Sequence, residues 1–364
     1  MPSLDLFEDT ARQLTVCNAC RYCEGYCAVF PAIESRRTFE PSDIQYIANL
    51  CHDCRDCLYA CQYAPPHEFA INIPSTLAQV REATYEQHRW PQQLGPLAGG
   101  VRPLLLLSAG ALMLGMAAVA ALEGVHALVS AHTAPGAFYS VIPAALMELL
   151  FIALGLLWIA AWGRSATSFW RSTAARSARA SLPAVLRAAG DALTLTYLGG
   201  GGQGCTYPEE SFSKTRRWLH HLVFYGFLLD LASTSLAAVY DHLLNLPAPY
   251  PLWSPVVVLG TIGGIGIVIG ATGLLVQKAR SDRSAAHLTM LRMDVAFLAA
   301  LLLVATSGIL LLGLRGTAAM GALLVLHLST VLAFFLTAPY GKFVHLVYRY
   351  TALVRFAAEQ RNQS

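Results

Sequence analysis

Eight of the nine cysteines lie within residues 17–61, and their spacing is typical of iron–sulfur ligands. They form the pattern C-x2-C-x2-C-x3-C twice, at an offset of 34 residues: Cys17, Cys20, Cys23 and Cys27, then Cys51, Cys54, Cys57 and Cys61. Pro31 and Pro65 repeat at the same offset, so the segment is an internal duplication. Three closely spaced cysteines can wrap one cube of iron and sulfide, and the fourth sulfur must come from elsewhere.

In two-cluster ferredoxins the fourth cysteine of each motif ligates the other cluster. We therefore predict two 4Fe–4S clusters with crossed ligation: Cys17, Cys20, Cys23 and Cys61 hold the first, and Cys51, Cys54, Cys57 and Cys27 hold the second. The alternative metal is zinc, but zinc sites prefer two separated C-x2-C pairs. The ninth cysteine, Cys205, lies outside both sets and is interpreted as an ordinary thiol.

The elements that carry these cysteines form an acidic head over residues 1–91. This segment has 7 Lys+Arg against 12 Asp+Glu, whereas residues 92–364 have 18 against 10. Between the two motifs, residues 41–50 resemble a helix, and the proline that usually follows the fourth cysteine is replaced by Ala28 and Gln62. The head is therefore predicted to be a helical two-cluster ferredoxin-like domain. No basic stretch followed by an apolar one opens the chain, so we expect no signal peptide and a head in a reducing compartment.

The rest of the chain is predicted to be a membrane domain over residues 92–364. Of all residues 55% are hydrophobic and only 13% are charged, and the mean hydropathy is +0.48. These values argue against a soluble globular protein, a disordered chain and a nucleic-acid binder. Six apolar runs are long enough to span a bilayer as helices, which predicts an all-α fold. The expected spans are about 103–126, 141–162, 218–241, 253–276, 294–314 and 317–341.

The loops orient these spans. Positive charges gather in the basic loop 163–217, in the loop between the fourth and fifth spans, and in the C-terminal tail. The positive-inside rule then places both termini in the cytoplasm of a multi-pass inner-membrane protein. Within the long loop, residues 164–196 are predicted to form an amphipathic surface helix, and the glycine-rich residues 199–204 are predicted to form a flexible turn.

Histidines in or beside the apolar spans are candidate haem ligands, because an imidazole is costly in a membrane. His220 and His221 open the third span, and His345 follows a Pro-Tyr-Gly break at the same depth, so a pair of them could flank a b-type haem. His327 lies 18 residues before His345, roughly 27 Å along a straight helix, and could serve a second haem. The alternative for His220 or His221 is a helix cap or a headgroup contact.

Three carboxylates in or beside the spans, Glu123, Glu148 and Asp230, look buried. They are candidates for a proton relay to a quinone, whose reduction consumes protons as well as electrons. A polar contact between helices is the alternative for each of them.

In combination, several segments resemble the tricarballylate/citrate utilisation protein B family over nearly the whole chain. They are the duplicated cysteine motif, residues 197–205 (YLGGGGQGC), residues 216–221 (RRWLHH) and residues 224–227 (FYGF). In addition, His327 to His345 is similar to the last haem-binding helix of the nitrate reductase γ subunit. In those subunits a second histidine follows the first by ten residues on another span, but here that place falls on Asp230 or Leu231.

The resemblance implies an electron-transfer subunit of an oxidoreductase system. Such proteins reoxidise an FAD-dependent dehydrogenase that converts tricarballylate to cis-aconitate, and they pass electrons through two 4Fe–4S clusters and one or two haems b to the quinone pool. The acidic head would be the docking surface for the flavoprotein. Two alternatives stay open: a membrane sensor or transporter with an iron–sulfur regulatory head, and a quinol-oxidising subunit that runs in the opposite direction. No flavin fingerprint and no nucleophile–base arrangement predicts catalysis on an organic substrate within this chain.

Overall fold

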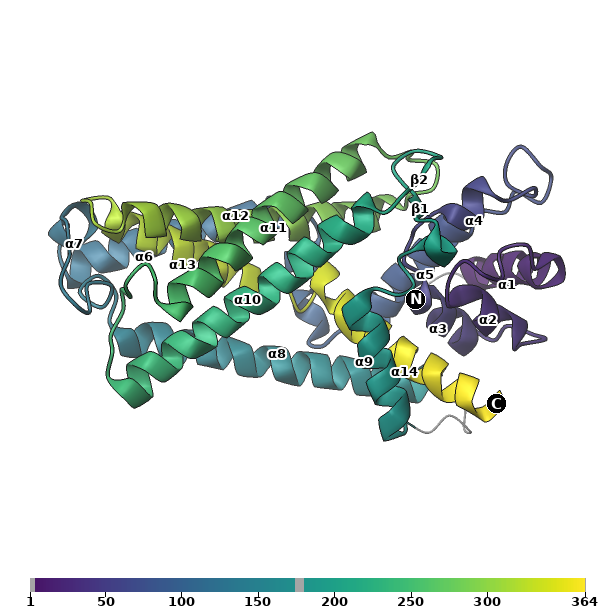
Figure 1. The fold of residues 1–364 in the computed structure, drawn as a ribbon, viewed down its shortest axis with the longest axis horizontal. Coiled ribbons are helices and arrows are strands. Elements are labelled where there is room, and N and C mark those ends of the chain that lie inside the picture. Colours follow the sequence, from purple (N-terminus) through teal and green to yellow (C-terminus); the bar gives the residue numbers. More distant parts are fainter. Residues whose placement is uncertain (1–3, 174–179, 364) are drawn as a thin grey trace.

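The computed structural model describes residues 4–173 and 180–363. Figure 1 shows an elongated molecule in which long helices run toward a helical head, and both termini lie at the head end. Apart from one short β-ribbon, the regular structure in the described residues is helical. An all-α fold with a head followed by a transmembrane bundle is the fold class that the sequence predicts.

The head begins with a group of five short and medium helices. They are α1 (Leu4–Cys20), α2 (Val29–Glu34), α3 (Pro41–Leu50), α4 (Asp56–Tyr59) and α5 (Ile73–His88). The helix α3 has the predicted bounds, and its first residue is a proline, which lacks the N–H that would be unpaired in a first turn. Its side chains from Ile44 to Leu50 are all buried, so α3 is the centre of the head.

Among the described residues, six helices are long and apolar enough to cross a membrane. They are α6 (Val101–Leu122), α8 (Ala144–Thr173), α10 (Thr215–Leu244), α11 (Pro255–Arg280), α12 (Leu288–Leu314) and α13 (Met320–Thr337). Two short elements, η1 (Gln92–Ala98) and α7 (His126–Val129), flank the first of them. Each of the six predicted runs overlaps one of these helices. The second helix continues to Thr173, because charged residues end an apolar run without ending a helix.

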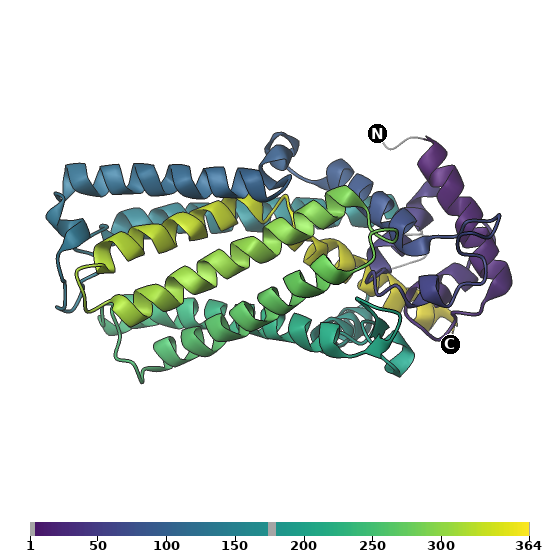
Figure 2. The same cartoon turned by 90° about the horizontal axis from the view of Figure 1, so that it is seen from above.

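The third and fourth spans, α10 and α11, lie side by side (Figures 1 and 2) and pack through glycines. A Cβ atom at Gly263 would lie 2.7 Å from the carbonyl oxygen of Gly226, and one at Gly270 would lie 2.7 Å from that of Leu219. Small residues thus let the two backbones approach closely. This contact fixes the head-side end of α10, where His220 lies.

The chain beyond the sixth span leaves the bundle, so the predicted extension of that helix through residue 341 is wrong. α13 ends at Thr337, a 3-10 turn η3 (Lys342–Val344) follows, and a separate helix α14 (His345–Gln363) packs on the head. Pro339 lies at the break, and the residue before a proline disfavours helical geometry. Tyr348 of α14 stacks on Tyr85 of α5, with ring centroids 5.0 Å apart.

A cluster of ion pairs fixes α14 to the head. The Arg355 guanidinium, whose side chain is 3% exposed, bonds to Asp43 at 2.9 Å and to Glu359 at 2.8 Å. Arg36 bonds to the same two carboxylates at 2.8 and 2.7 Å, and both guanidinium groups lie against the Tyr46 ring. Head and membrane domain therefore share one core and are not joined by a free linker.

The long loop before α10 is more ordered than predicted. It contains α9 (Leu182–Thr194), the 3-10 turn η2 (Gly200–Gly202) and the antiparallel strands β1 (Cys205–Thr206) and β2 (Phe212–Ser213). The single amphipathic helix predicted over 164–196 is therefore wrong: its first part belongs to α8, its last part contains α9, and residues 174–179 lie outside the described residues. Ala184 and Ala188 bury one face of α9 on α14.

Candidate electron-transfer site

Four cysteine thiols meet at the outer side of the head. Cys17 and Cys20 lie in the last turn of α1, Cys23 follows after Arg21, whose φ is 56°, and Cys61 follows α4. Burial and the neighbouring Cys61, Cys23 and Cys20 raise the pKa of Cys17 to about 12. Thiols gathered closely enough to interact electrostatically are typical of a cation site whose ligands are brought together before the metal binds.

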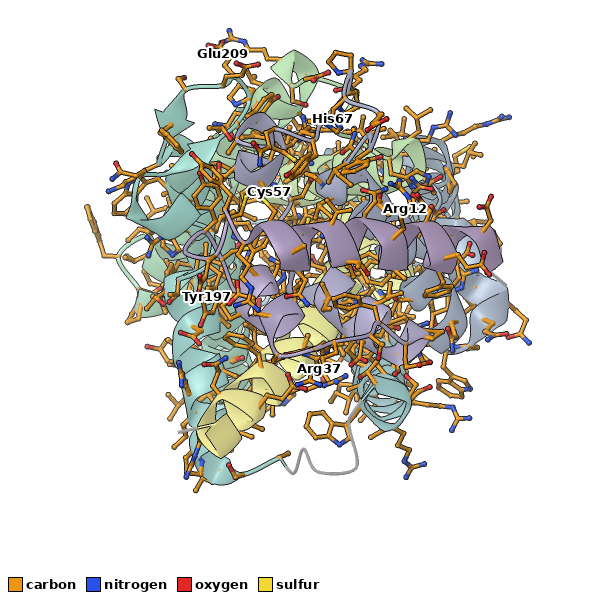
Figure 3. All side chains as sticks on the ribbon, turned by 90° about the vertical axis from the view of Figure 1, so that its right-hand side faces the viewer. Arg12, Arg37, Cys57, His67, Tyr197 and Glu209 are labelled. Atoms are coloured by element: carbon orange, nitrogen blue, oxygen red, sulfur yellow. The ribbon has the colours of Figure 1, made fainter. Side chains whose placement is uncertain are left out.

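The other four thiols line a cavity deeper in the head. Its walls include Cys27, Cys51, Cys54 and Cys57 together with the apolar side chains of Val29, Phe30, Ile73 and Pro74. Burial, and then the neighbouring Cys51 and Cys27, raise the pKa of Cys57 well above its usual value. Figure 3 looks onto the head end, where Cys57 lies close to α1. His52 and Arg55 also line this cavity. A mainly apolar cavity lined by four cysteine sulfurs has the donor set of an iron–sulfur cluster.

Three buried or half-buried arginines hold the backbone of the second cysteine motif. Arg81 of α5 donates to the Cys51 carbonyl at 2.6 Å, and Arg349 of α14 donates to the same oxygen. Arg216 of α10 donates to the Asp53 carbonyl at 2.5 Å and to the His52 carbonyl at 3.2 Å. Two of these arginines belong to the membrane domain, so the bundle itself positions this cysteine loop.

Two of the predicted haem ligands face one another next to this loop. The rings of His220 on α10 and His345 on α14 have centroids 6.3 Å apart. The His345 Nδ1–H donates to the Lys342 carbonyl at 2.6 Å, which leaves Nε2 available as a ligand, and the His220 Nδ1 is buried without a partner in the described structure. Burial lowers the pKa of His345 well below its usual value, so this imidazole stays neutral, the form that binds a metal.

An ion cluster holds the turn that carries His345. Asp294 of α12 bonds to Lys342 of η3 at 2.7 Å, and its other oxygen pairs with Lys278 of α11. Three elements are thereby joined at the head-side end of the bundle. The backbone of η3 orients the His345 ring through the Lys342 carbonyl. Many metal-binding imidazoles are oriented in the same way, by a hydrogen bond from the ring nitrogen that does not bind the metal.

A histidine without a predicted role, His52, lies between the cysteine loop and this pair. It follows Cys51 directly, and its Nδ1 accepts a hydrogen bond from Arg349. Burial, and then the charges of Arg349 and the nearby His220, lower the pKa of His52 well below its usual value, so its ring is neutral. The signal in the sequence was its position beside a cysteine ligand, but only the folded chain brings it to the histidine pair.

The structure does not bring His221 and His327 to this pair. The His221 ring lies against Trp218 and Tyr225, with centroids 5.9 and 5.7 Å away. The His327 Nδ1 lies 3.0 Å from the Ser307 hydroxyl, and its ring packs on Gly308 of α12. His327 thus has a hydroxyl partner, whereas the His221 Nε2, like the His220 Nδ1, is buried without a hydrogen-bond partner in the described structure. What separates His221 from the pair is its place among aromatic rings on another side of α10.

The three candidate carboxylates of a proton relay lie apart. Glu123 is exposed at the end of α6, so its predicted burial is wrong. Glu148 lies 3.4 Å from the His242 ring, at the end of the bundle far from the head. Asp230 packs against Gly263 in the middle of α10. It lies twelve residues, or roughly 18 Å along the helix, before His242, the residue that lies beside Glu148. These positions do not form one chain of carboxylates.

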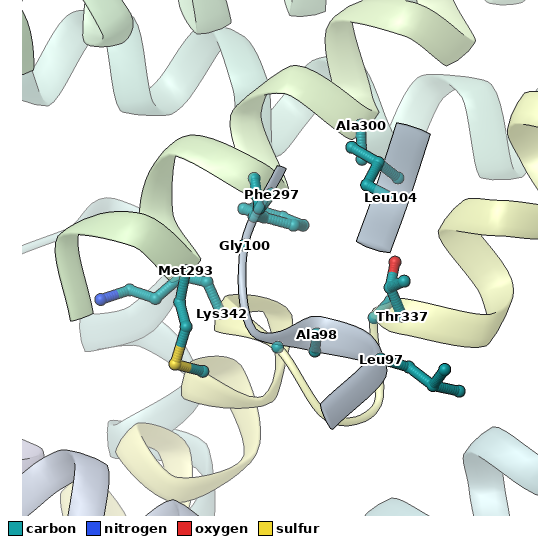
Figure 4. Close-up of a pocket in the computed structure, with 12 residues that line it drawn as sticks. Leu97, Ala98, Gly100, Leu104, Met293, Phe297, Ala300, Thr337 and Lys342 are labelled. Atoms are coloured by element: carbon teal, nitrogen blue, oxygen red, sulfur yellow. The ribbon is translucent and has the colours of Figure 1, made fainter. Parts of the chain in front are cut away.

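An apolar cavity opens near the turn at His345 (Figure 4). Its walls come from η1, the first turn of α6, α12 and the break between α13 and η3, and they include Leu97, Leu104, Phe297, Thr337 and Lys342. Lys342 is also the residue whose carbonyl accepts from His345. The cavity and the histidine pair therefore share one wall.

Comparison with known proteins identifies relatives of the whole chain. The family model for citrate utilization protein B matches residues 98–364, and the model for the Fer4-like domain of the same protein matches residues 10–87. Citrate utilization protein B of Escherichia coli is 43% identical over 357 residues, which cover 97% of this chain and 92% of that protein. No solved structure matches this chain.

Proposed function

Because the chain belongs to the citrate utilization protein B family, we propose that it is a membrane electron-transfer protein that reoxidises a partner flavoprotein dehydrogenase and delivers the electrons to the quinone pool. The chain is an iron–sulfur-type protein related to citrate utilization, and six helices within its described residues are long and apolar enough to cross a membrane. The cofactors, the acceptor and the partner are the proposed part.

The observation that carries the proposal is the order of ligand-type residues through the molecule. The outer four cysteines are followed by the cavity with the inner four, then by His52, and then by the facing rings of His220 and His345. Redox centres must lie close together for electrons to pass between them. A row of sites from the surface of the head to the edge of the membrane bundle is what such a path requires.

We assign the outer site, Cys17, Cys20, Cys23 and Cys61, to one 4Fe–4S cluster, and the inner site, Cys51, Cys54, Cys57 and Cys27, to a second. His220 and His345 would hold one haem b. When bound, these groups supply carriers that accept and release single electrons. The protein contributes the burial of the inner site, the three arginines on its backbone, and the neutral, oriented imidazole of His345.

The partner would dock on the outer side of the head. Tyr22 lies between two cysteines of the outer site and is 69% exposed, and Phe69 is 40% exposed. Residues 1–91 carry 12 acidic against 7 basic side chains. Exposed aromatics within an acidic surface suit a transient protein partner, since aromatic groups anchor and charge steers. We propose an FAD-dependent dehydrogenase of a tricarboxylic acid such as tricarballylate as this partner.

The quinone would bind in the apolar cavity shown in Figure 4. Its lining is mainly apolar, with Thr337 and Lys342 as polar members, and it lies beside the turn that orients His345. A quinone ring would enter it only after the surrounding side chains move apart. Filling the cavity by Ala300→Trp should raise the KM for quinone while the haem spectrum stays unchanged. An unaltered KM would place the quinone elsewhere.

With basic loops at the head end, we further propose that both termini are cytoplasmic and that the membrane is the inner one.

A reduced-minus-oxidised optical spectrum of the anaerobically purified protein tests the proposal. We expect a sharp b-type haem band that is lost in His220→Ala and in His345→Ala. The matched controls are His221→Ala, one residue away on the same helix, and His327→Ala, both of which should keep the band.

A band that survives in both His220→Ala and His345→Ala would remove this pair as haem ligands. A band halved in His327→Ala would show a second haem, contrary to the single one proposed. A wild-type protein with clusters but without haem would favour a sensor or transporter with an iron–sulfur head.

A further inference from the structure

The glycine-rich loop before α10 is part of the wall around the inner cysteine site. The Gly201 N–H donates to the Tyr26 carbonyl at 3.0 Å, next to Cys27. Thr206 donates to one oxygen of the Asp56 carboxylate twice, from its N–H at 2.5 Å and from its hydroxyl at 2.8 Å. The loop predicted to be a flexible turn is therefore docked on both cysteine motifs, through Gly201 on the first and through the adjoining Thr206 on the second.

Glycine is needed for this close fit. Gly200 has a φ of 51°, and a Cβ atom there would lie 2.5 Å from the second oxygen of Asp56. That oxygen is buried and has no hydrogen-bond partner in the described structure, and Asp56 as a whole is 2% exposed. An unpartnered buried carboxylate oxygen is costly unless a donor or a cation comes near it.

The ninth cysteine lies at this point. Cys205 is 1% exposed, and its Sγ, the Sγ of Cys54 and a carboxylate oxygen of Asp56 all lie within 4.8 Å of one another. Its thiol is oriented toward the Leu198 carbonyl at 3.7 Å. Leu195, Leu198 and Tyr207 close the pocket around the two sulfurs, so water does not compete for them.

We propose that Cys205 is a fifth cysteine of the inner cluster site, and that its thiol donates a hydrogen bond to the Cys54 sulfur when Cys54 is bound to iron. This rests on the proposed function, because it requires a 4Fe–4S cluster in the inner cavity. Four cysteines already complete the ligand set, so Cys205 is a positioning residue and not a ligand. An iron-bound thiolate is charged and is therefore a stronger acceptor than the Leu198 carbonyl.

The consequence concerns the reduction potential. A hydrogen bond to a cluster sulfur stabilises the reduced, more negative state and raises the potential. The donor comes from a loop of the membrane domain, so the docking of this loop sets the potential of the inner cluster. The outer site has no corresponding cysteine among the described residues, and it provides an internal reference within the same molecule.

The test uses the full-length protein with both clusters, in the wild type and in Cys205→Ala and Cys205→Ser. EPR-monitored redox titration should show a more negative midpoint for the inner cluster in Cys205→Ala and an unchanged midpoint for the outer one. Cys205→Ser keeps a donor and should stay nearer to the wild type. The Asp53 N–H also donates to an inner-site sulfur, that of Cys51, at 3.4 Å. Pulsed ENDOR before and after transfer to D2O should therefore detect an exchangeable proton coupled to the inner cluster in addition to this N–H, and the additional coupling should be lost in Cys205→Ala only.

Two results would overturn the inference. An unchanged inner midpoint with an unchanged proton coupling in Cys205→Ala would leave the thiol a packing group. Loss of the inner cluster in Cys205→Ala together with its retention in Cys54→Ser would make Cys205 the ligand in place of Cys54. Absence of clusters from the wild-type protein is a different outcome, because it would refute the proposed function itself.

Discussion

The two copies of the cysteine motif have the same spacing but very different surroundings. In the first copy Cys17, Cys20 and Cys23 are partly exposed, and Tyr22 between them is 69% exposed. In the second copy Cys51 and Cys54 are buried, and the neighbouring backbone bonds to arginines from α5, α10 and α14. The duplicated sequence thus gave one copy that faces outward and one that faces the bundle. An electron carrier needs both, since one site must meet a partner and the other must meet the next centre.

The strongest test of this comparison removes one predicted ligand at a time from each copy. Cys27→Ser and Cys51→Ser should each lose the inner cluster, and Cys17→Ser and Cys61→Ser should each lose the outer one. Iron content should halve in all four variants. EPR spectra of the remaining cluster should be alike for Cys27→Ser and Cys51→Ser. If the spectrum of Cys27→Ser instead matches that of Cys17→Ser, each motif holds its own cluster and the crossed assignment is wrong.

An arginine near each copy should contribute differently to stability. Arg81→Met leaves the buried Cys51 carbonyl with one donor fewer and should lower the free energy of unfolding by about 3 kcal/mol. Arg12 on the outer side pairs with Asp9 and donates to the Phe69 carbonyl at 2.9 Å, both at the exposed surface, so Arg12→Met should cost about 1 kcal/mol. Thermal unfolding in detergent measures both. Equal losses would mean that the two copies are held alike.

Two glycine substitutions, one in the loop docked on the second copy and one in the first copy, should differ by a smaller free energy of unfolding. Gly200→Ala introduces a Cβ atom at positive φ and 2.5 Å from Asp56, and should destabilise the protein by about 1–2 kcal/mol. Gly25, in the first motif, has open space around its Cβ direction, and Gly25→Ala should be neutral or slightly stabilising. Limited proteolysis of the loop before α10 reports the same difference. A loop cut equally in both variants would refute docking by Gly200.

The smallest expected effect is a pH dependence of the Tm that comes from the buried His88 of α5. His88 is 4% exposed between α5 and α8, with the Ser168 hydroxyl 2.8 Å from its Nδ1, and burial lowers its pKa to about 4. Its unfolded form binds a proton more readily, so its contribution to stability is complete above about pH 6.5 and is lost as the pH falls toward 4. The Tm of the wild type should fall over this range, and less so in His88→Gln. Parallel curves would show that His88 does not contribute.

Much of the architecture followed from local pattern. The six apolar runs and the helix over residues 41–50 were predictable because hydropathy and helix-start signals act within a short segment. The course of the chain after Thr337 was not, because the apolar pattern continues up to the break and does not show that α14 packs on the head. The start of the predicted basic loop likewise turned out to be the end of α8.

Within the candidate site, residue type was predictable and partnership was not. His220 and His221 are adjacent in sequence but point about 100° apart around the helix, and only the packing of α10 decides which of them meets His345. His52 and Cys205 had no assigned role, because their neighbours come from helices and loops distant in sequence. The haem ligands and the crossed cysteine sets stay predictions until the spectra are measured.

The sequence by itself determined that eight cysteines form two equal sets, that six apolar runs are long enough to cross a membrane, and that acidic charge gathers in the head. Spacing and composition are local properties, and they need no fold to be read. Only the tertiary structure decided that the second set faces the bundle, that α14 and the glycine-rich loop close around it, and that His220 faces His345. These are contacts between residues far apart in the chain. They form only when several helices pack together and bury their apolar faces at the same time.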